Sequence, residues 1–387
     1  MIPPGAGARP DDERYAGPPP TLRPGPDQLP PAPWPQPAPW PPQGAAWPQQ
    51  GPWVPQPGPW PPQVVWAPPP GTPPHDEPQP FLRAMRARDW AWWRPLVGLL
   101  LLAVVFGVAS AVVGVLGLLT GISPDLTMDD LLDPAVLLVT NGALVVAIPV
   151  VWLAWAVAHG MRPGWSSSVL ARLRWRLLPR LTLLALATLG LVIAAGVAFD
   201  LTAGEGQVEG PIPGWGWLLV VVLLTTPLQS AAEEYLFRGY LSQAIAGWVR
   251  RPSVGAVLAA VVTGTLFSLA HLPPDLPTFL DRFFFALAAS AVVWLTGGLE
   301  AAIVLHAVNN VLLFVLAGLL GEDVIAMGEV PEGAGLASLA FGVLGMAGYV
   351  AAVAWWARRA RPERRTEAQD LRPPWLRPAA AAPDPAA

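Results

Sequence analysis

The chain has 387 residues, of which 53% are apolar and only 13% are charged. An ordinary soluble domain carries about 25% charged residues, so this composition indicates a membrane protein. The net charge of −4 gives no basis for nucleic-acid binding, and the absence of cysteine excludes a disulfide framework and a thiolate metal site.

Residues 1–80 are rich in proline, in phrases such as PAPWPQPAPWPPQ. Proline fixes φ and removes backbone donors, so we expect a disordered cytoplasmic arm of polyproline-II character. The arm is a candidate docking segment for a proline-binding partner or, through its tryptophans, a membrane-surface anchor, and the alternative that we favour is a simple disordered extension. It contains no apolar core of a signal peptide, so insertion is expected to rely on the first transmembrane helix.

Residues 81–358 contain eight apolar runs near the 20 residues needed to cross about 30 Å of hydrocarbon. We therefore predict an all-α, polytopic membrane helical bundle in contact with lipid, followed at 359–387 by an Arg-rich and then Pro/Ala-rich disordered tail. The expected spans are Leu96–Leu119, Ala135–Ala158, Leu181–Phe199, Trp215–Tyr240, Val254–His271, Phe279–Thr296, Glu300–Leu320 and Leu336–Ala357.

Arginines flank alternate ends of these runs. They precede the first run, fill the loop 159–180, and follow the fourth and eighth runs, whereas the loops 121–134, 200–214, 272–277 and 321–335 contain acids and no arginine. The positive-inside rule then predicts a multi-pass protein of the plasma membrane with both termini in the cytoplasm. In the loop 159–180, Arg alternates with Leu and Trp175, which suits either a short interfacial helix or a plain topogenic loop.

Two adjacent carboxylates, Glu233 and Glu234, lie in the run that begins at Trp215. An ionisable side chain inside a bilayer costs at least about 2.5–3.5 kcal/mol, so their presence requires an explanation. Arg238 follows Glu234 at i,i+4, the favourable spacing for an ion pair. Glu233 points about 100° away around the helix, so it is left free to face a cavity as a candidate general base.

Later runs carry His271, which ends a helix just before two prolines, and His306, with Asn310 four residues beyond it. His306 and Asn310 share a helix face and can together donate hydrogen bonds to a developing oxyanion. His271 can hold water or a metal beside Glu233. Glu233, His271 and His306 are therefore candidate Zn²⁺ ligands, although the sequence contains no HExxH motif.

Two other interpretations of these polar residues stay open on physical grounds. An intramembrane histidine or a Glu–Arg pair often serves only as an interhelical contact in a structural or scaffolding role. Buried ionisable groups also mark ion and substrate pathways, as in proton-coupled transporters.

The order of these residues along the chain resembles the CAAX prenyl endopeptidase and bacteriocin-processing family of intramembrane proteases. The resemblance covers residues 215–320 and includes the run LTGGLEAAIVLHAVNN. It rests on three motifs on successive membrane helices, which are Glu233-Glu234-x-x-x-Arg238, Phe267-x-x-x-His271 and His306-x-x-x-Asn310.

The resemblance implies an endopeptidase acting on an apolar or lipid-anchored peptide in a cavity open to the cytoplasm. Glu233 would activate water and His271 would position it, while His306 and Asn310 would stabilise the oxyanion. Glu234 and Arg238 would order the helix. Members are described as metalloproteases and also as glutamate-dependent enzymes without an essential metal, and eukaryotic members cleave prenylated C-terminal motifs.

The predicted topology leaves one geometric difficulty. His306 starts its helix from the cytoplasmic side, whereas His271 finishes its helix near the opposite side. Both can meet Glu233 only if helices are tilted, short or sunken around a water-filled vestibule. Asp281 and Arg282 either neutralise each other or line that vestibule.

Overall fold

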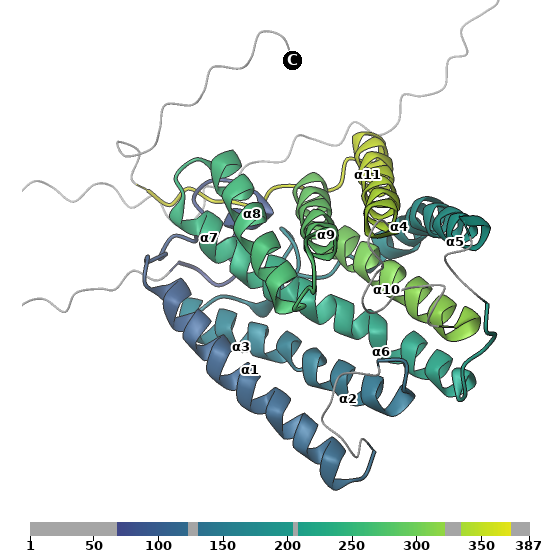
Figure 1. Ribbon diagram of the computed structural model, residues 1–387. Coiled ribbons are helices and arrows are strands. Elements are labelled where there is room, and N and C mark those ends of the chain that lie inside the picture. Colours follow the sequence, from purple (N-terminus) through teal and green to yellow (C-terminus); the bar gives the residue numbers. More distant parts are fainter. Residues whose placement is uncertain (1–67, 123–130, 204–207, 322–333, 373–387) are drawn as a thin grey trace, which may run out of the picture. The chain divides into compact units, whose positions relative to one another are not determined.

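The computed structural model describes residues 68–122, 131–203, 208–321 and 334–372, which lie in one compact unit that begins at Pro68. These residues form a helical bundle, and their only β-type pairing consists of two isolated bridges (Figure 1). Eight helical stretches are long and apolar enough to cross a membrane, at the positions that the sequence predicts. The predicted all-α membrane fold is therefore confirmed.

Three of the spans are interrupted rather than continuous. The second consists of α2 (Pro134–Val145) and α3 (Ala147–His159), separated at Val146 because Pro149 has no N–H to donate to the carbonyl of Val145. The third joins α4 (Leu178–Ala185) to α5 (Leu191–Ala203) through a π-helical turn, and the fourth joins α6 (Trp215–Leu236) to α7 (Ser242–Trp248) through another, Phe237–Leu241.

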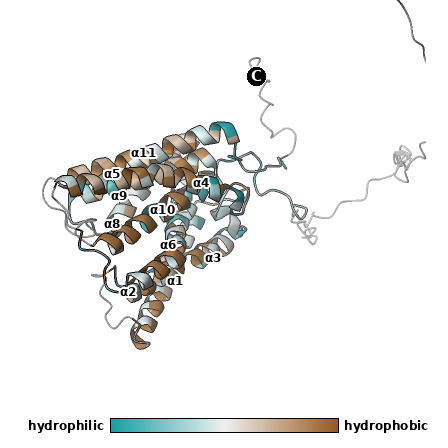
Figure 2. Cartoon of the chain, turned by 90° about the vertical axis from the view of Figure 1, so that its right-hand side faces the viewer, coloured by the Kyte–Doolittle hydropathy of each residue, from teal (hydrophilic) through white to brown (hydrophobic). Residues whose placement is uncertain are grey.

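The other spans are single helices, and α6 lies at the centre of the bundle. It packs against α2, α3 and α10, while α9 packs against α8, α10 and α11 (Figure 1). The outward faces carry exposed leucines and valines, which suits contact with lipid (Figure 2). The single helices are α1 (Arg94–Leu119), α8 (Pro252–Ala270), α9 (Leu276–Thr296), α10 (Glu300–Leu320) and α11 (Ala334–Ala360).

One end of the bundle is covered by three segments, residues 68–93, 161–174 and 361–372, which we call the cap. The first and third segments pair with each other through a bridge between Pro80 and Arg365 and through the backbone bond from Thr366 N to Gln79 O of 2.9 Å. The chain therefore enters and leaves the bundle at the same end.

The cap changes two boundaries expected from the sequence. Residues 68–80 were assigned to the disordered arm and 359–372 to the disordered tail, yet His75 in the first and Thr366 in the second are both buried in the compact unit. Each segment satisfies the other's backbone groups, which composition alone does not reveal. The remainder of the predicted arm, 1–67, and of the tail, 373–387, lies outside the described residues.

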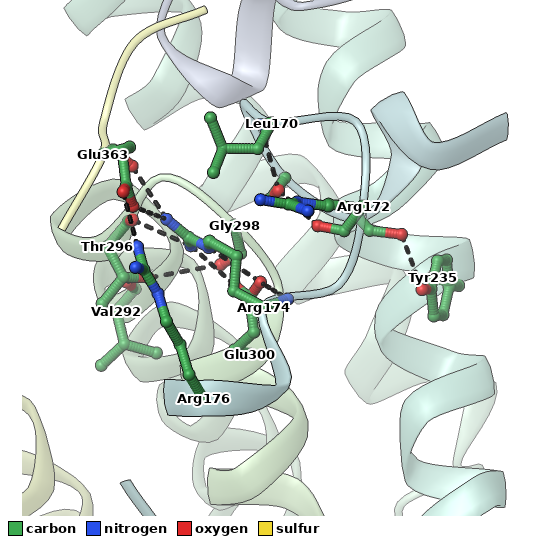
Figure 3. Close-up of polar contacts among 12 residues, drawn as sticks. Leu170, Arg172, Arg174, Arg176, Tyr235, Val292, Thr296, Gly298, Glu300 and Glu363 are labelled. Atoms are coloured by element: carbon green, nitrogen blue, oxygen red, sulfur yellow. Dashed lines mark hydrogen bonds and ion pairs between the residues drawn. The ribbon is translucent and has the colours of Figure 1, made fainter. Parts of the chain in front are cut away.

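The cap is fastened to the bundle by a buried ion pair between Arg174 and Glu300 (Figure 3). The sequence left the loop 159–180 open between a short interfacial helix and a plain topogenic loop. In the structure this segment forms short 3₁₀ turns, Pro163–Ser166 and Trp175–Leu177, before α4 begins, and Arg174 turns inward to meet Glu300 at the start of α10. A side chain at Gly298 would overlap both charged groups, so glycine is required there.

Candidate active site

The last turn of α6 carries both carboxylates of the first motif, and both are buried. Glu234 Oε1 accepts a hydrogen bond of 2.8 Å from Arg238 Nη1, which is the ion pair expected from the i,i+4 spacing. Arg238 also donates through Nη2 to the carbonyl of Ala286 on α9 at 2.9 Å, and its guanidinium lies over the Phe267 ring. The pair thus ties α6 to α8 and α9 while keeping the charge of Glu234 compensated.

His306 lies between the two carboxylates. Its Nδ1 is 2.9 Å from Glu234 Oε1, and its Nε2 is 3.8 Å from Glu233 Oε2. Phe267 and Phe285 contact the ring edge-on, which restricts its rotation. A carboxylate that is paired with a guanidinium is an acceptor only. His306 must therefore be the donor, and its Nδ1–H makes the hydrogen bond to Glu234. In the neutral ring, Nε2 therefore presents a lone pair towards Glu233.

His271 approaches Glu233 from the end of α8, where it is the residue that caps the helix. Its Nδ1 is 2.7 Å from the carbonyl of Phe267, which can only accept, so Nδ1 carries the proton. Its Nε2 lies 3.9 Å from Glu233 Oε2, and about a third of its side chain is exposed. His271 thus forms the accessible wall of the site.

Three hydrogen-bond acceptors therefore converge on one point: Glu233 Oε2 and the Nε2 atoms of His271 and His306. Glu233 Oε2 is buried without a hydrogen-bond partner among the described residues, and both histidine distances are too long for direct hydrogen bonds. Acceptors that face each other need a donor between them, which a water molecule supplies through its two hydrogens. The arrangement is suited to hold a water against a carboxylate.

The same three groups were the candidate zinc ligands. Tetrahedral zinc with bonds of about 2.0–2.2 Å would bring its ligand atoms to about 3.3–3.6 Å from one another. The measured separations of 3.8 and 3.9 Å are wider. Within the described parts of the chain, no group of three His, Cys, Asp or Glu side chains could hold a metal ion, so the side chains as they stand do not fit a zinc site.

The structure shows how His271 and His306 can both lie near Glu233, although the topology places them at opposite ends of their helices. α10 begins at Glu300, which is fully buried beneath the cap, so His306 lies deeper in the bundle than a helix starting at the surface would place it. The fourth span is also long, with 34 residues from Trp215 to Trp248, and Glu233 lies well inside it. A sunken α10 and a long α6–α7 span bring the motif residues to one level.

Among the described residues, Asn310 makes no hydrogen bond to another residue of the motifs. Its Oδ1 accepts from Asn309 Nδ2 at 3.3 Å, and within the described chain its NH₂ group has no acceptor. It lies one turn beyond His306 on α10 with a free donor. Asp281 and Arg282 form no ion pair with each other, and Arg282 instead donates to the carbonyl of Thr278.

One residue of the site was missed in the sequence analysis. Gln229 is buried one turn before Glu233 on α6, and its Nε2 donates to Glu233 Oε1. The i,i+4 spacing of Gln229 and Glu233 within PLQSAAEE was a usable signal. A hydrogen bond of 2.7 Å between Tyr235 and Ser167 also links this helix to the cap (Figure 3).

Comparison with known proteins confirms the resemblance to this protease family over the segment that carries the site. Residues 215–312 match the family model of Type II CAAX prenyl endopeptidase Rce1-like proteins. An uncharacterized protein of Bacillus subtilis (strain 168), YyaK, is 30% identical over 103 residues, which are 25% of this chain and 33% of that relative. The chain thus matches only about a third of that curated relative's length, and no solved structure matches it.

Proposed function

We propose that this protein is an intramembrane endopeptidase that hydrolyses a peptide bond of an apolar or lipid-anchored substrate with a water activated by Glu233. The observation that carries the proposal is the buried Glu233 Oε2, which has no hydrogen-bond partner in the part of the chain that the structure describes and faces two histidine Nε2 atoms at 3.8 and 3.9 Å. The family match over residues 215–312 supports the same chemistry.

The reaction begins when the bound water gives one hydrogen to Glu233 Oε2 and the other to a histidine Nε2. Its oxygen attacks the carbonyl carbon of the scissile bond while Glu233 takes the proton. The tetrahedral intermediate then breaks its C–N bond, and Glu233 returns the proton to the departing nitrogen. The second proton of the water passes from the new carboxyl group to the amine, so the products are a carboxylate and an ammonium group, and Glu233 is ionised again.

The negative charge of Glu233 moves during the attack to the oxyanion of the tetrahedral intermediate, where a hydrogen-bond donor can stabilise it. The ion pair of Glu234 and Arg238 keeps its own charges balanced beside the reacting groups. Glu234 and Arg238 therefore contribute by holding the His306 tautomer.

The sequence analysis expected His306 and Asn310 to stabilise the oxyanion together, and we now assign them different roles. The Nδ1–H of His306 is given to Glu234, so Nε2 of the neutral ring accepts from the water and does not donate to an oxyanion. The NH₂ group of Asn310 has no acceptor among the residues that the structure describes, and we assign to it the stabilisation of the oxyanion.

We infer that the cap faces the cytoplasm of a plasma-membrane protein and that both termini emerge there. The arginines that flank the spans lie at this end, and one of them, Arg83, donates to the carbonyl of Arg250 in the connection between α7 and α8. The positive-inside rule assigns such an end to the cytoplasm. Reporter fusions at 128, 207 and 328 should report the opposite side, and a cytoplasmic signal at any of them would contradict the topology.

The activity is tested with the full chain in lipid nanodiscs. A peptide bearing a farnesylated cysteine in a C-terminal CAAX sequence and the same peptide without the lipid are incubated with wild type, Glu233→Gln and the exposed-site control Glu367→Gln, and products are identified by mass spectrometry. We expect cleavage by wild type and the control, and a loss of at least about 10³-fold in Glu233→Gln, because an amide cannot take the proton.

The transporter alternative gives the opposite result in the same membranes. It predicts proton- or ion-coupled flux in proteoliposomes that depends on Glu233, without cleavage of either peptide or of other apolar peptides. That combination of results would overturn the enzyme proposal.

A further inference from the structure

We propose that Gln229 is a positioning residue that holds one oxygen of Glu233 and thereby determines that the other, Oε2, meets the water. This inference rests on the proposed function for its catalytic meaning. Gln229 is not part of the three motifs, and it contacts neither histidine among the described residues.

The geometry gives Glu233 two oxygens with different surroundings. Oε1 accepts a hydrogen bond from Gln229 Nε2, while Oε2 faces His271 and His306 and has no hydrogen-bond partner within the described ranges of the chain. A carboxylate without such a contact can rotate about its terminal torsion, which is soft, and exchange its two oxygens. One donor on Oε1 removes that freedom and directs Oε2 to the point where the acceptors converge.

The orientation of the Gln229 amide is itself determined by a neighbour. Ser230 Oγ donates to Gln229 Oε1 at 3.3 Å, which leaves the NH₂ group facing Glu233. The reversed amide would set two oxygens against each other. Both Gln229 and Ser230 are buried, so water does not replace these contacts readily.

A role in filling space is the competing explanation, and a second glutamine of the same span provides the matched control. Gln243 in α7 is fully buried, and its Nε2 donates only to the carbonyls of Trp165 and Gly239, at 3.1 and 3.3 Å. Gln243→Leu removes a buried amide of identical chemistry without touching Glu233. Gln229→Leu and the more flexible Gln229→Met remove the donor to Glu233.

The first measurement needs no turnover. Infrared difference spectra, with Glu233→Gln as the subtracted reference, isolate the carboxylate stretching bands of Glu233 in the full chain. Because these bands respond to a hydrogen bond on one oxygen, we expect them to shift in Gln229→Leu and in Gln229→Met, and to stay in place in Gln243→Leu. Unchanged bands in the folded Gln229 variants, or an equal shift in Gln243→Leu, would overturn the inference.

The second measurement uses the farnesylated peptide. A misdirected carboxylate should lower kcat by about 10–10²-fold and leave KM nearly unchanged, since positioning acts in the transition state. A KM effect alone would overturn the positioning role. If wild type cleaves neither peptide, the proposed function fails, while the infrared result still tests the Gln229–Glu233 contact.

Discussion

The protein contains two buried clusters of Glu and Arg, and they differ in how completely their polar atoms are paired. In the cap, Arg174 donates through Nε and Nη2 to the two oxygens of Glu300, at 2.9 and 2.7 Å, and through Nη1 to the carbonyl of Glu363 at 2.9 Å. Every nitrogen of the guanidinium and both oxygens of Glu300 have partners, although Glu363 Oε2, 3.7 Å from Arg174 Nη1, accepts no hydrogen bond among the described residues. Such a network stabilises one arrangement.

In the candidate active site the pairing is incomplete. Among the described residues, Glu233 Oε2, Glu234 Oε2 and Arg238 Nε are buried without hydrogen-bond partners. Each unpaired buried polar atom costs about 1–3 kcal/mol, so the fold retains this cluster at an energetic cost. A buried ion pair alone therefore does not indicate function in this protein. Unpaired hydrogen-bond acceptors that face one point, as around Glu233 Oε2, do indicate it.

The largest expected effect is a difference in the free energy of unfolding between variants of the two clusters. Glu300→Gln leaves Arg174 buried opposite a neutral amide and should lower the free energy of unfolding by about 3–5 kcal/mol. Glu233→Gln should leave it nearly unchanged, because Glu233 has no cationic partner at hydrogen-bond distance. Thermal unfolding in detergent checks both, with Glu367→Gln as the exposed control. Equal stability of the two variants would remove the distinction between the clusters.

The sequence predicts much of this arrangement, but only where the information is local. Hydropathy and length are properties of continuous segments, so the eight spans could be predicted. The pair Glu234–Arg238 follows from helical spacing, and Gln229–Glu233 could have been found in the same way. Arg174 and Glu300 lie 126 positions apart, and no periodicity connects them.

The depth of the helices was also inaccessible to sequence reasoning. That α10 starts beneath the cap depends on Glu300 being covered by the segments 161–174 and 361–372, which are neither apolar nor periodic. The same holds for residues 68–80, whose proline-rich composition does not differ from that of the preceding arm. Their order arises from pairing with a segment almost 290 positions away, as in the bond from Gln79 N to Thr366 Oγ1.

The next effect concerns catalysis alone. Asn310→Ala removes the free amide donor of α10 and should lower the rate of peptide cleavage by about 10²–10³-fold, since one oxyanion donor contributes that much in acyl transfer. Asn309→Ala is the matched control, because it removes only the donor to Asn310 Oδ1. A comparable rate loss in both variants, or a large loss of stability in Asn310→Ala, would contradict the assigned role.

A smaller effect tests the connection between the two clusters. Tyr235 follows Glu234 on α6 and reaches the cap through its hydrogen bond to Ser167. Tyr235→Phe should lower the free energy of unfolding by about 0.5–1.5 kcal/mol. A double-mutant cycle with Ser167→Ala, measured by thermal unfolding, isolates the coupling of the two hydroxyls. Strictly additive effects would show that this bond does not couple α6 to the cap.

The smallest expected effect is a pH dependence of the cap. His75 is buried with its ring edge-on to Trp165, its Nε2 is 2.7 Å from the carbonyl of Ala84, and its Nδ1 has no partner among the described residues. Burial is the main cause that lowers the pKa of His75 below its ordinary value of 6.5. The hydrogen bond with the carbonyl of Ala84 and the charge of Asp76 oppose the shift, while nearby Arg88 adds to it.

The sign of the effect follows from which state binds the proton. Below pH 6.5 the unfolded segment takes up a proton that the folded cap resists, so the stabilisation present above pH 6.5 is lost as the pH falls towards the lower pKa of the folded form. Amide hydrogen exchange of residues 68–93, corrected for the intrinsic pH dependence of exchange, should therefore show weaker protection at pH 5.5 than at pH 7.5. In His75→Gln, which keeps a neutral donor and does not titrate, protection should be independent of pH across this interval. An equal loss of protection in the variant would assign the pH response to another group and leave the cap without a titratable element at His75.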